Sequence, residues 1–232
     1  MIAPRTTVVR AIAVAVSVAV SVAVLGAACR GRSDAPARGE GTPVARAGDA
    51  AEARPPDPEH PLSKESIYDL DLALTNQRAE AVSLAVHRGH PTIVSMLYAS
   101  CSVACPRLID EVKAFEAALP PAQRDDLRVL LVSFDPARDT PARLAELAAQ
   151  HRVALDRWQL ATAPDPELRE LAAVLGIRYR VLDSGEYFHT SVVTLLDRDG
   201  RPIARVEGLG RSAKPLTDAM AAGASAPARR AD

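Results

Sequence analysis

Apolar runs typical of buried strands alternate with helical patterns through the middle of this chain, and this alternation limits its fold more than any other feature. Residues 91–99 (PTIVSMLYA) and 127–135 (LRVLLVSFD) are predicted as buried strands, because they are largely apolar and rich in β-branched residues. Residues 104–119 and 140–151 repeat apolar side chains every three to four positions, as helices do. Strands that alternate with helices predict a parallel sheet covered by helices on its faces.

Hairpins at both ends extend this pattern and make the predicted sheet mixed. The fold class predicted is α/β: a thioredoxin-like fold with a mixed central sheet flanked by helices and an added N-terminal hairpin. The further elements are a hairpin over residues 66–75 and 80–85, a short strand over 158–162, a helix over 165–176, a closing antiparallel hairpin over 191–197 and 202–208, and a last helix over 212–223.

Residues typical of helix ends support these helices. Thr140 is predicted as an N-cap with a proline directly after it, and Asp165 is predicted as the N-cap of the next helix. Gly176 follows that helix, at a position where a left-handed residue commonly ends one. Pro215 is expected to interrupt the last helix, because proline has no N–H to donate.

The N-terminus has the pattern of an export signal. Arg5 and Arg10 precede an uncharged run over residues 11–28, and small residues lead up to Cys29. Cleavage before Cys29 would give a lipoprotein acylated on that cysteine, an uncut run could span a bilayer, and cleavage beyond it would release a soluble secreted form. All three export the domain to oxidising surroundings. We expect the lipoprotein, in the cell envelope on the outer, periplasmic face of the cytoplasmic membrane.

Composition divides the rest of the chain. Residues 29–62 are rich in Pro, Gly, Ala and charge and contain no aromatic residue, so they predict a disordered tether. Residues 63–215 predict the folded domain, and residues 216–232 predict the end of the last helix and a frayed tail. Lys and Arg number 28 against 29 Asp and Glu, a balance that argues against a nucleic-acid partner.

Two cysteines, Cys101 and Cys105, stand four residues apart between the first buried strand and its helix. A permanent disulfide, a metal site, a redox pair and plain core packing are all compatible with this spacing. The junction should lie at the carboxyl edge of the sheet, where α/β proteins place their chemistry. A helix N-terminus stabilises the thiolate form that binds metals and attacks disulfides. Residues four apart can flank one soft ion, so the spacing favours a metal pair that can also oxidise.

Two sulfur atoms rarely complete the coordination of a transition metal, so a third ligand is expected. His60 falls in the tether, His87 and His90 precede the first buried strand, and His151 ends a helix that runs back from the carboxyl edge. His189 instead precedes a strand predicted to run antiparallel to the first, which places it at the same edge as the cysteines. Two thiolates and one imidazole suit copper as Cu(I), whereas a closed zinc site normally has a fourth ligand.

Three sequence motifs occur in the order typical of one protein family, and together they resemble the Sco/SenC family of copper proteins over roughly residues 62–210. The motifs are YASCSVACP at residues 98–106, VSFDPARDTPARL at 132–144 and YFHTSVVTLLDRDGR at 187–201. The resemblance implies a thioredoxin-like fold on a membrane tether, a copper cofactor as Cu(I) or Cu(II), and a part in assembling the binuclear copper centre of cytochrome c oxidase. The metal ligands that it implies are Cys101, Cys105 and His189.

The chain also departs from the family pattern. Phe188 stands where members often carry Asp before the ligand histidine, and residues 102–104 (SVA) replace a Pro and an acidic residue between the cysteines. Asp135 matches the first Asp of the family's DPxxDTP motif and is predicted either to lie directly behind the metal ligands or to cap the turn before Thr140. Asp139 is interpreted as a turn residue only.

The sequence therefore predicts a membrane-tethered copper metallochaperone that binds one copper ion. It would deliver the ion to the binuclear copper site of cytochrome c oxidase, or maintain the thiols of that site. The expected partner is the copper-bearing oxidase subunit or another copper protein of the envelope. The alternative is a thiol–disulfide oxidoreductase of the envelope without an obligatory metal, with Cys101 and Cys105 as its redox pair. A peroxidase of the same fold would need a pocket of Thr and Arg around a single reactive cysteine, which the sequence does not provide.

Overall fold

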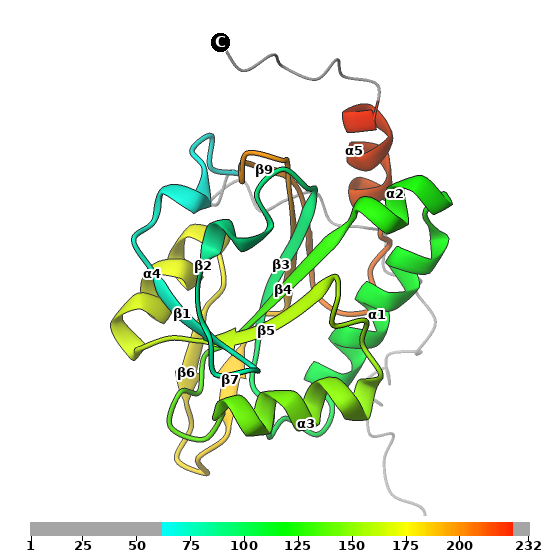
Figure 1. The fold of residues 1–232 in the computed structure, drawn as a ribbon. Helices are drawn as coiled ribbons and strands as arrows, with labels where there is room; N and C mark the ends of the chain where they lie inside the picture. Colours follow the sequence, from blue (N-terminus) through cyan, green and yellow to red (C-terminus); the bar gives the residue numbers. More distant parts are fainter. Residues whose placement is uncertain (1–61, 225–232) are drawn as a thin grey trace, which may run out of the picture. The chain divides into compact units, whose positions relative to one another are not determined.

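The structure is a computed structural model that describes residues 62–224 (Figure 1). The predicted export signal, Cys29, the tether up to residue 61 and the tail from residue 225 lie outside the described residues. Within the described part of the chain, no helix is both long enough and apolar enough to cross a membrane.

A mixed seven-stranded sheet forms the centre of the domain, which confirms the predicted fold class. In spatial order its strands are β2 (Ala81–Ser83), β1 (Ala73–Asn76), β5 (Trp158–Thr162), β4 (Arg128–Ser133), β3 (Thr92–Leu97), β8 (Val192–Leu196) and β9 (Pro202–Glu207). The central strands β3, β4 and β5 are parallel. The closing hairpin β8–β9 continues the sheet antiparallel beside β3, and the added N-terminal hairpin β1–β2 pairs with β5 at the other edge.

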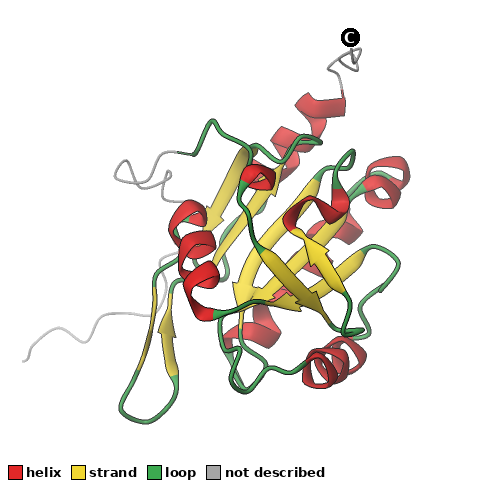
Figure 2. Ribbon diagram, turned by 60° about the vertical axis from the view of Figure 1, so that its left-hand side comes forward, coloured by secondary structure: helices red, strands yellow, loops and turns green. Residues whose placement is uncertain are grey.

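Helices lie on both faces of this sheet (Figure 2). The helix α1 (Ala104–Ala118) connects β3 to β4, and α3 (Pro141–His151), which contacts α1, connects β4 to β5. The helix α4 (Asp165–Leu175) follows β5, and α5 (Lys214–Ala224) contacts β9. Three short helices were not predicted: η1 (Ile67–Asp69), η2 (Leu84–His87) and α2 (Pro121–Asp126). The predicted strands over residues 66–75 and 80–85 are therefore wrong in part, because η1 forms before β1 begins and η2 forms where β2 ends.

The apolar runs read from the sequence are the buried centre of the domain. All six residues of β3 are buried, as are five of the six in β4. Strands covered by helices on both faces bury side chains in both directions, so they read as continuous apolar runs instead of alternating ones. The helix α1 buries the stripe Leu108, Ile109, Val112 and Phe115 against them. This packing fixes the carboxyl ends of β3 and β4, from which the candidate site is built.

The helix ends agree with the sequence in part. The Thr140 hydroxyl accepts a hydrogen bond from the Arg143 N–H at 3.3 Å, and Gly176 is left-handed at φ 70°, as predicted. Asp165 as an N-cap is wrong: it is the first residue of α4, and its carboxylate pairs with Arg169 one turn later at 2.8 Å. The interruption at Pro215 is also wrong, because α5 begins one residue earlier and a proline in the first turn gives up no intrahelical bond.

The turn between β8 and β9 gives a prediction for stability. Gly200 has φ +85°, and a Cβ atom there would lie 2.4 Å from the Tyr68 ring. We expect Gly200→Ala to lower the free energy of unfolding by roughly 2–4 kcal/mol, from left-handed strain plus overpacking. Gly89, with φ +91° and no neighbour within 4 Å of its Cβ position, is the matched control. Urea unfolding of the full chain checks this, and an equal loss in Gly89→Ala would contradict the packing argument.

Candidate metal centre

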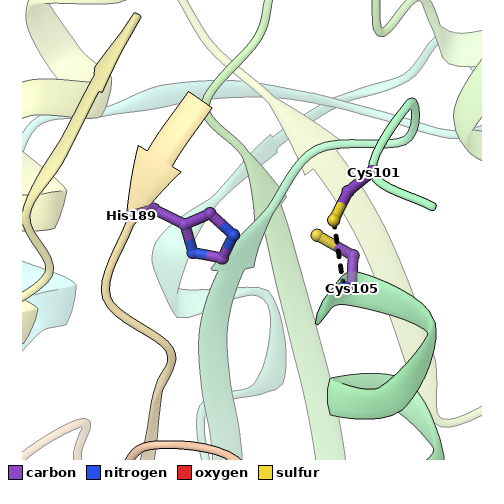
Figure 3. Close-up of side chains that lie close together, drawn as sticks. All are labelled: Cys101, Cys105 and His189. Atoms are coloured by element: carbon purple, nitrogen blue, oxygen red, sulfur yellow. Dashed lines mark hydrogen bonds between the residues drawn. The ribbon is translucent and has the colours of Figure 1, made fainter. Parts of the chain in front are cut away.

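The two cysteines lie where β3 passes into α1. Cys101 is half-buried in the connecting loop, and Cys105 is buried in the first turn of the helix; both are free thiols. The backbone N–H of Cys105 donates to the Cys101 Sγ at 3.3 Å, the dashed line in Figure 3. The Tyr98 N–H donates to the Cys105 Sγ at 3.5 Å. Each sulfur atom therefore accepts a backbone hydrogen bond, and such a bond by itself favours the thiolate form.

The two thiols differ in their acidity. Burial alone would raise the pKa of Cys101, but hydrogen bonds from the Cys105, Val103 and Ala104 backbone N–H groups and from the Cys105 thiol outweigh it, and the pKa is lowered. Burial raises the pKa of Cys105 far above its ordinary value, and the neighbouring Cys101 adds to this. Cys101 is therefore the thiol that ionises first and the one that solvent can reach.

His189 ends a small hairpin outside the main sheet. Its strands, β6 (Tyr179–Val181) and β7 (Tyr187–His189), pair antiparallel and were not predicted. The chain then enters β8, which runs antiparallel to β3, so His189 lies at the carboxyl end of β3 as the sequence predicted. Its ring lies 5.2 Å from the Phe134 ring and 5.9 Å from the Tyr98 ring, centroid to centroid. Burial lowers the pKa of His189, so the imidazole keeps a free lone pair at lower pH than an ordinary histidine.

The structure brings the three predicted ligands together. The Sγ atoms of Cys101 and Cys105 and a ring nitrogen of His189 all lie within 4.8 Å of one another, and the imidazole points toward the sulfur pair (Figure 3). Ligand bonds of roughly 2.0–2.3 Å place three donors around one ion about 3.5–4 Å apart, so closing onto an ion needs a contraction of about 1 Å. Two soft sulfurs with one imidazole fit copper.

The other histidines lie apart from this cluster. His90 pairs with Asp126 at 2.6 Å, before the start of β4, and His151 lies 4.0 Å from Asp110. His87 is buried in η2, and burial lowers its pKa to about 4. His60 falls outside the described residues. Within residues 62–224, Cys101, Cys105 and His189 are the only group of three side chains close enough to hold a metal.

Two buried carboxylates follow β4 and contact the segments that carry the ligands. Asp135, 1% exposed, pairs with Arg138 and accepts a hydrogen bond from the Tyr187 hydroxyl at 3.3 Å. Asp139, also 1% exposed, accepts from the Ala99 N–H at 2.7 Å and from the Ser133 hydroxyl. The interpretation of Asp139 as a turn residue alone therefore missed its contact with the segment that carries the cysteines. The available signal was that Asp139 follows Asp135 in the same turn after β4.

The rim of the site carries the residues in which the chain departs from the expected motif. Val103, between the cysteines, is 76% exposed, and Phe188, before the histidine, is 53% exposed. The Arg180 guanidinium lies over the Phe188 ring at 5.5 Å from its centroid. Apolar Phe188 and basic Arg180 thus lie where an acidic residue was expected beside the ligand histidine.

Comparisons with known proteins give a family and a fold for this chain. The family model described as SCO1/SenC matches residues 62–223. A SCO1 protein homolog from Bacillus subtilis is 25% identical over 146 residues, which cover 61% of this chain and 75% of the relative. A copper-bound structure of ScoI from Bradyrhizobium japonicum matches with TM-score 0.53 and 24% identity, over 66% of this chain and 95% of that one. BsSco, described as a member of the Sco family of cytochrome c oxidase assembly proteins with a disulfide switch, matches with TM-score 0.58 and 22% identity, over 71% and 99%.

Proposed function

Because the chain belongs to the SCO1/SenC family, we propose that it is a copper metallochaperone that binds one Cu(I) ion through Cys101, Cys105 and His189. The observation that carries this proposal is the meeting of two thiols and one imidazole within 4.8 Å. The copper-bound ScoI structure, which shares the fold, supports the choice of metal. Soft sulfur donors with one imidazole also favour Cu(I) over harder ions.

The burial of the three side chains suggests how the ion is held and handed on. Cys105 lies beneath the site, whereas Cys101 and His189 are each half-exposed. The lowered pKa values of Cys101 and His189 weaken the competition of protons with the metal for these two groups. An acceptor approaching from solvent would meet the Cys101 and His189 side of the ion first. Transfer would then proceed by exchange of these two ligands while Cys105 retains the ion.

We infer that the acceptor is the copper-bearing subunit of cytochrome c oxidase or another copper protein of the envelope. The description of BsSco as an oxidase assembly protein supports the first of these. The exposed Val103 and Phe188 beside the ligands offer apolar surface for contact with such a partner.

The second candidate function is thiol–disulfide exchange, which the unequal thiols favour. Cys101 is half-exposed with a lowered pKa, and Cys105 is buried with a raised one, the arrangement of an attacking and a resolving cysteine. The Cys101 thiolate would attack a partner disulfide and release one partner thiolate. Cys105, on losing its proton, would then attack the mixed disulfide and release the second. The chain would end with a Cys101–Cys105 disulfide, and two electrons would have reduced the partner.

Metal analysis of the reduced full chain, paired with a disulfide-reductase assay, separates the two candidates. We expect one Cu(I) per chain, held during dialysis against a weak chelator. Zn(II) at the same concentration should not displace it, because the site has no fourth protein ligand among the described residues. A chain that reduces disulfides rapidly and retains no copper would instead be a thiol–disulfide oxidoreductase.

We also propose that the chain is anchored by lipid on Cys29, with residues 29–62 as a tether, so that the metal centre faces the outside of the cytoplasmic membrane. Acylation of Cys29 leaves Cys101 and Cys105 as a pair in an oxidising compartment. Intact-mass measurement on membrane-extracted protein should show loss of residues 1–28 and the added mass of acyl chains. A chain that still begins at Met1 would indicate an uncleaved helix, and one that begins beyond Cys29 would indicate a secreted form.

A further inference from the structure

The segment that links β4 to α3, residues 133–140, lies between the two parts of the chain that carry the metal ligands. We call it the bridging segment. It begins at the carboxyl end of β4, directly beside the end of β3, because Leu97 and Ser133 are paired in the parallel ladder. Its side chains contact the cysteine-bearing segment through Asp139 and the histidine-bearing hairpin through Phe134 and Asp135.

Toward the cysteines, the contact is made at Ala99, two residues before Cys101. The Asp139 carboxylate accepts the Ala99 N–H at 2.7 Å, and the Arg143 guanidinium, in the first turn of α3, donates to the Ala99 carbonyl at 3.2 Å. Both backbone polar groups of Ala99 are therefore hydrogen-bonded to residues near the start of α3. The Ser133 hydroxyl donates to the same carboxylate and fixes its orientation. These bonds set where the chain leaves β3 on its way to Cys101.

Toward the histidine, the contact is made on the β6–β7 hairpin, which has no ladder pairing with the main sheet. The Asp135 carboxylate accepts from the Tyr187 hydroxyl, two residues before His189, and pairs with Arg138. Arg138 in turn donates to the Gly185 carbonyl at 2.9 Å and lies over the Tyr187 ring. The Phe134 ring stacks on the Tyr179 ring at 4.8 Å. Since sheet hydrogen bonds do not hold the hairpin, side-chain contacts such as these must place it.

We propose that Asp139 and Asp135 are positioning residues of the metal centre: Asp139 holds the backbone that carries the two cysteines, and Asp135 holds the hairpin that carries His189. One rigid turn thereby sets the distance between the sulfur pair and the imidazole. Neither carboxylate is a ligand, and each acts through the backbone or the tyrosine that it contacts. The copper part of this inference rests on the proposed function, whereas the positioning itself can be measured without metal.

The burial of both acids supports positioning over a plain turn role. Each is 1% exposed, and a carboxylate is taken out of water only where hydrogen bonds and ion pairs offset its desolvation. The backbone of the turn is already held by the Arg138 and Asp139 N–H groups donating to the Asp135 carbonyl. The backbone of the turn therefore does not depend on the two carboxylates. Besides Arg138 and Ser133 within the turn, they bind the Ala99 N–H and the Tyr187 hydroxyl on segments far away in sequence. A further bond, from the Tyr98 hydroxyl to Glu186 at 2.7 Å, joins β3's end to the hairpin directly, so loss of Asp135 should loosen the hairpin without releasing it.

Hydrogen exchange, followed by mass spectrometry on the reduced, metal-free full chain, tests the positioning. Asp135→Ala should speed exchange in residues 179–189 at least about tenfold and leave residues 98–105 within about twofold of the unaltered chain. Asp139→Ala should give the opposite pattern. Asp126→Ala is the matched control, because Asp126 also pairs with an arginine, Arg198, but lies at the other end of β4. It should speed neither segment selectively.

Two milder variants keep the test decisive if an alanine variant fails to fold. Tyr187→Phe removes only the hydroxyl and should speed the hairpin in the same direction by a smaller factor. Asp135→Asn keeps an acceptor for that hydroxyl and should recover part of the loss in Asp135→Ala. If Asp135 variants speed both segments alike, or only as much as Asp126→Ala does, the carboxylate supports general stability and the inference is wrong.

X-ray absorption at the copper edge gives the second readout. In copper-loaded Asp135→Ala, the imidazole contribution should fall while both sulfur neighbours remain, which a general loss of stability would not produce. An unchanged imidazole contribution would overturn the role assigned to Asp135. If the unaltered chain binds no copper, the proposed function fails, and the exchange pattern alone still decides whether the two carboxylates position these segments.

Discussion

The double variant Cys101→Ser/Cys105→Ser is expected to bind Cu(I) more than about a hundredfold more weakly than the unaltered reduced chain. This loss exceeds the one usually caused by removing a residue that only hydrogen-bonds a metal ligand. Two of the three soft donors disappear, and a serine hydroxyl does not ionise to replace them near neutral pH. The measurement is competition for Cu(I) against a chromophoric chelator, performed without oxygen. Serine can still accept the Tyr98 N–H that now bonds to Cys105, so the fold should persist.

His189→Ala is the matched comparison. It removes one donor of three and leaves both sulfurs, so it should weaken Cu(I) binding less than the double variant does. His189 lies on a hairpin outside the main sheet, so circular dichroism of the variant should resemble that of the unaltered chain. Equal Cu(I) binding by the double cysteine variant would place the metal elsewhere.

Oxidation of the chain should abolish Cu(I) binding as completely as the double variant does. A small disulfide such as oxidised glutathione would take two electrons from Cys101 and Cys105, whose thiols lose two protons and join as a disulfide. The sulfur atoms are then no longer thiolates and do not hold the ion. Binding should return in full after a reductant converts the disulfide back to two thiols. The measurement is Cu(I) affinity before oxidation, after it and after reduction.

The state of the thiols must be known for this result to count. Intact mass should show the loss of two hydrogen atoms without an added glutathione. His189→Ala is a useful control, because it keeps both cysteines and should oxidise like the unaltered chain. If mass confirms the disulfide and Cu(I) affinity is unchanged, the cysteines are not the copper ligands.

The sequence predicted the ligand cluster because chain direction was readable from it. Two apolar runs marked β3 and β4, and their connection through a helix implied parallel pairing. The strand after His189 was predicted to run antiparallel to β3, so its start, next to His189, lies at the edge where Cys101 lies. No distance was needed, since parallel and antiparallel pairing alone decide which end of the sheet each residue reaches.

The hairpin that carries His189 was not predictable in the same way. Its strands are three residues each, and both include exposed or half-exposed positions, so they show neither an apolar run nor a clear alternation. Side-chain contacts with Phe134 and Asp135 stabilise it, and such contacts lie far apart in sequence. The contact of Asp139 with Ala99 was not predicted for the same reason, because the two residues are 40 positions apart in the sequence.

Local rules were also insufficient at one helix end. Asp165 is a residue type that commonly serves as an N-cap. Here Pro164 occupies the N-cap position instead, so the helix begins one residue sooner than expected. The Asp165 carboxylate then finds Arg169 one turn later on the helix surface. Thr140 follows the rule because its hydroxyl is free to reach the Arg143 N–H.

X-ray absorption at the copper edge of the reduced, Cu(I)-loaded full chain reports which atoms surround the ion. We expect two sulfur neighbours and one imidazole nitrogen, with the nitrogen lost in His189→Ala and the sulfurs lost in Cys101→Ser/Cys105→Ser. A spectrum without sulfur neighbours, or one that the double cysteine variant leaves unchanged, would contradict this ligand set.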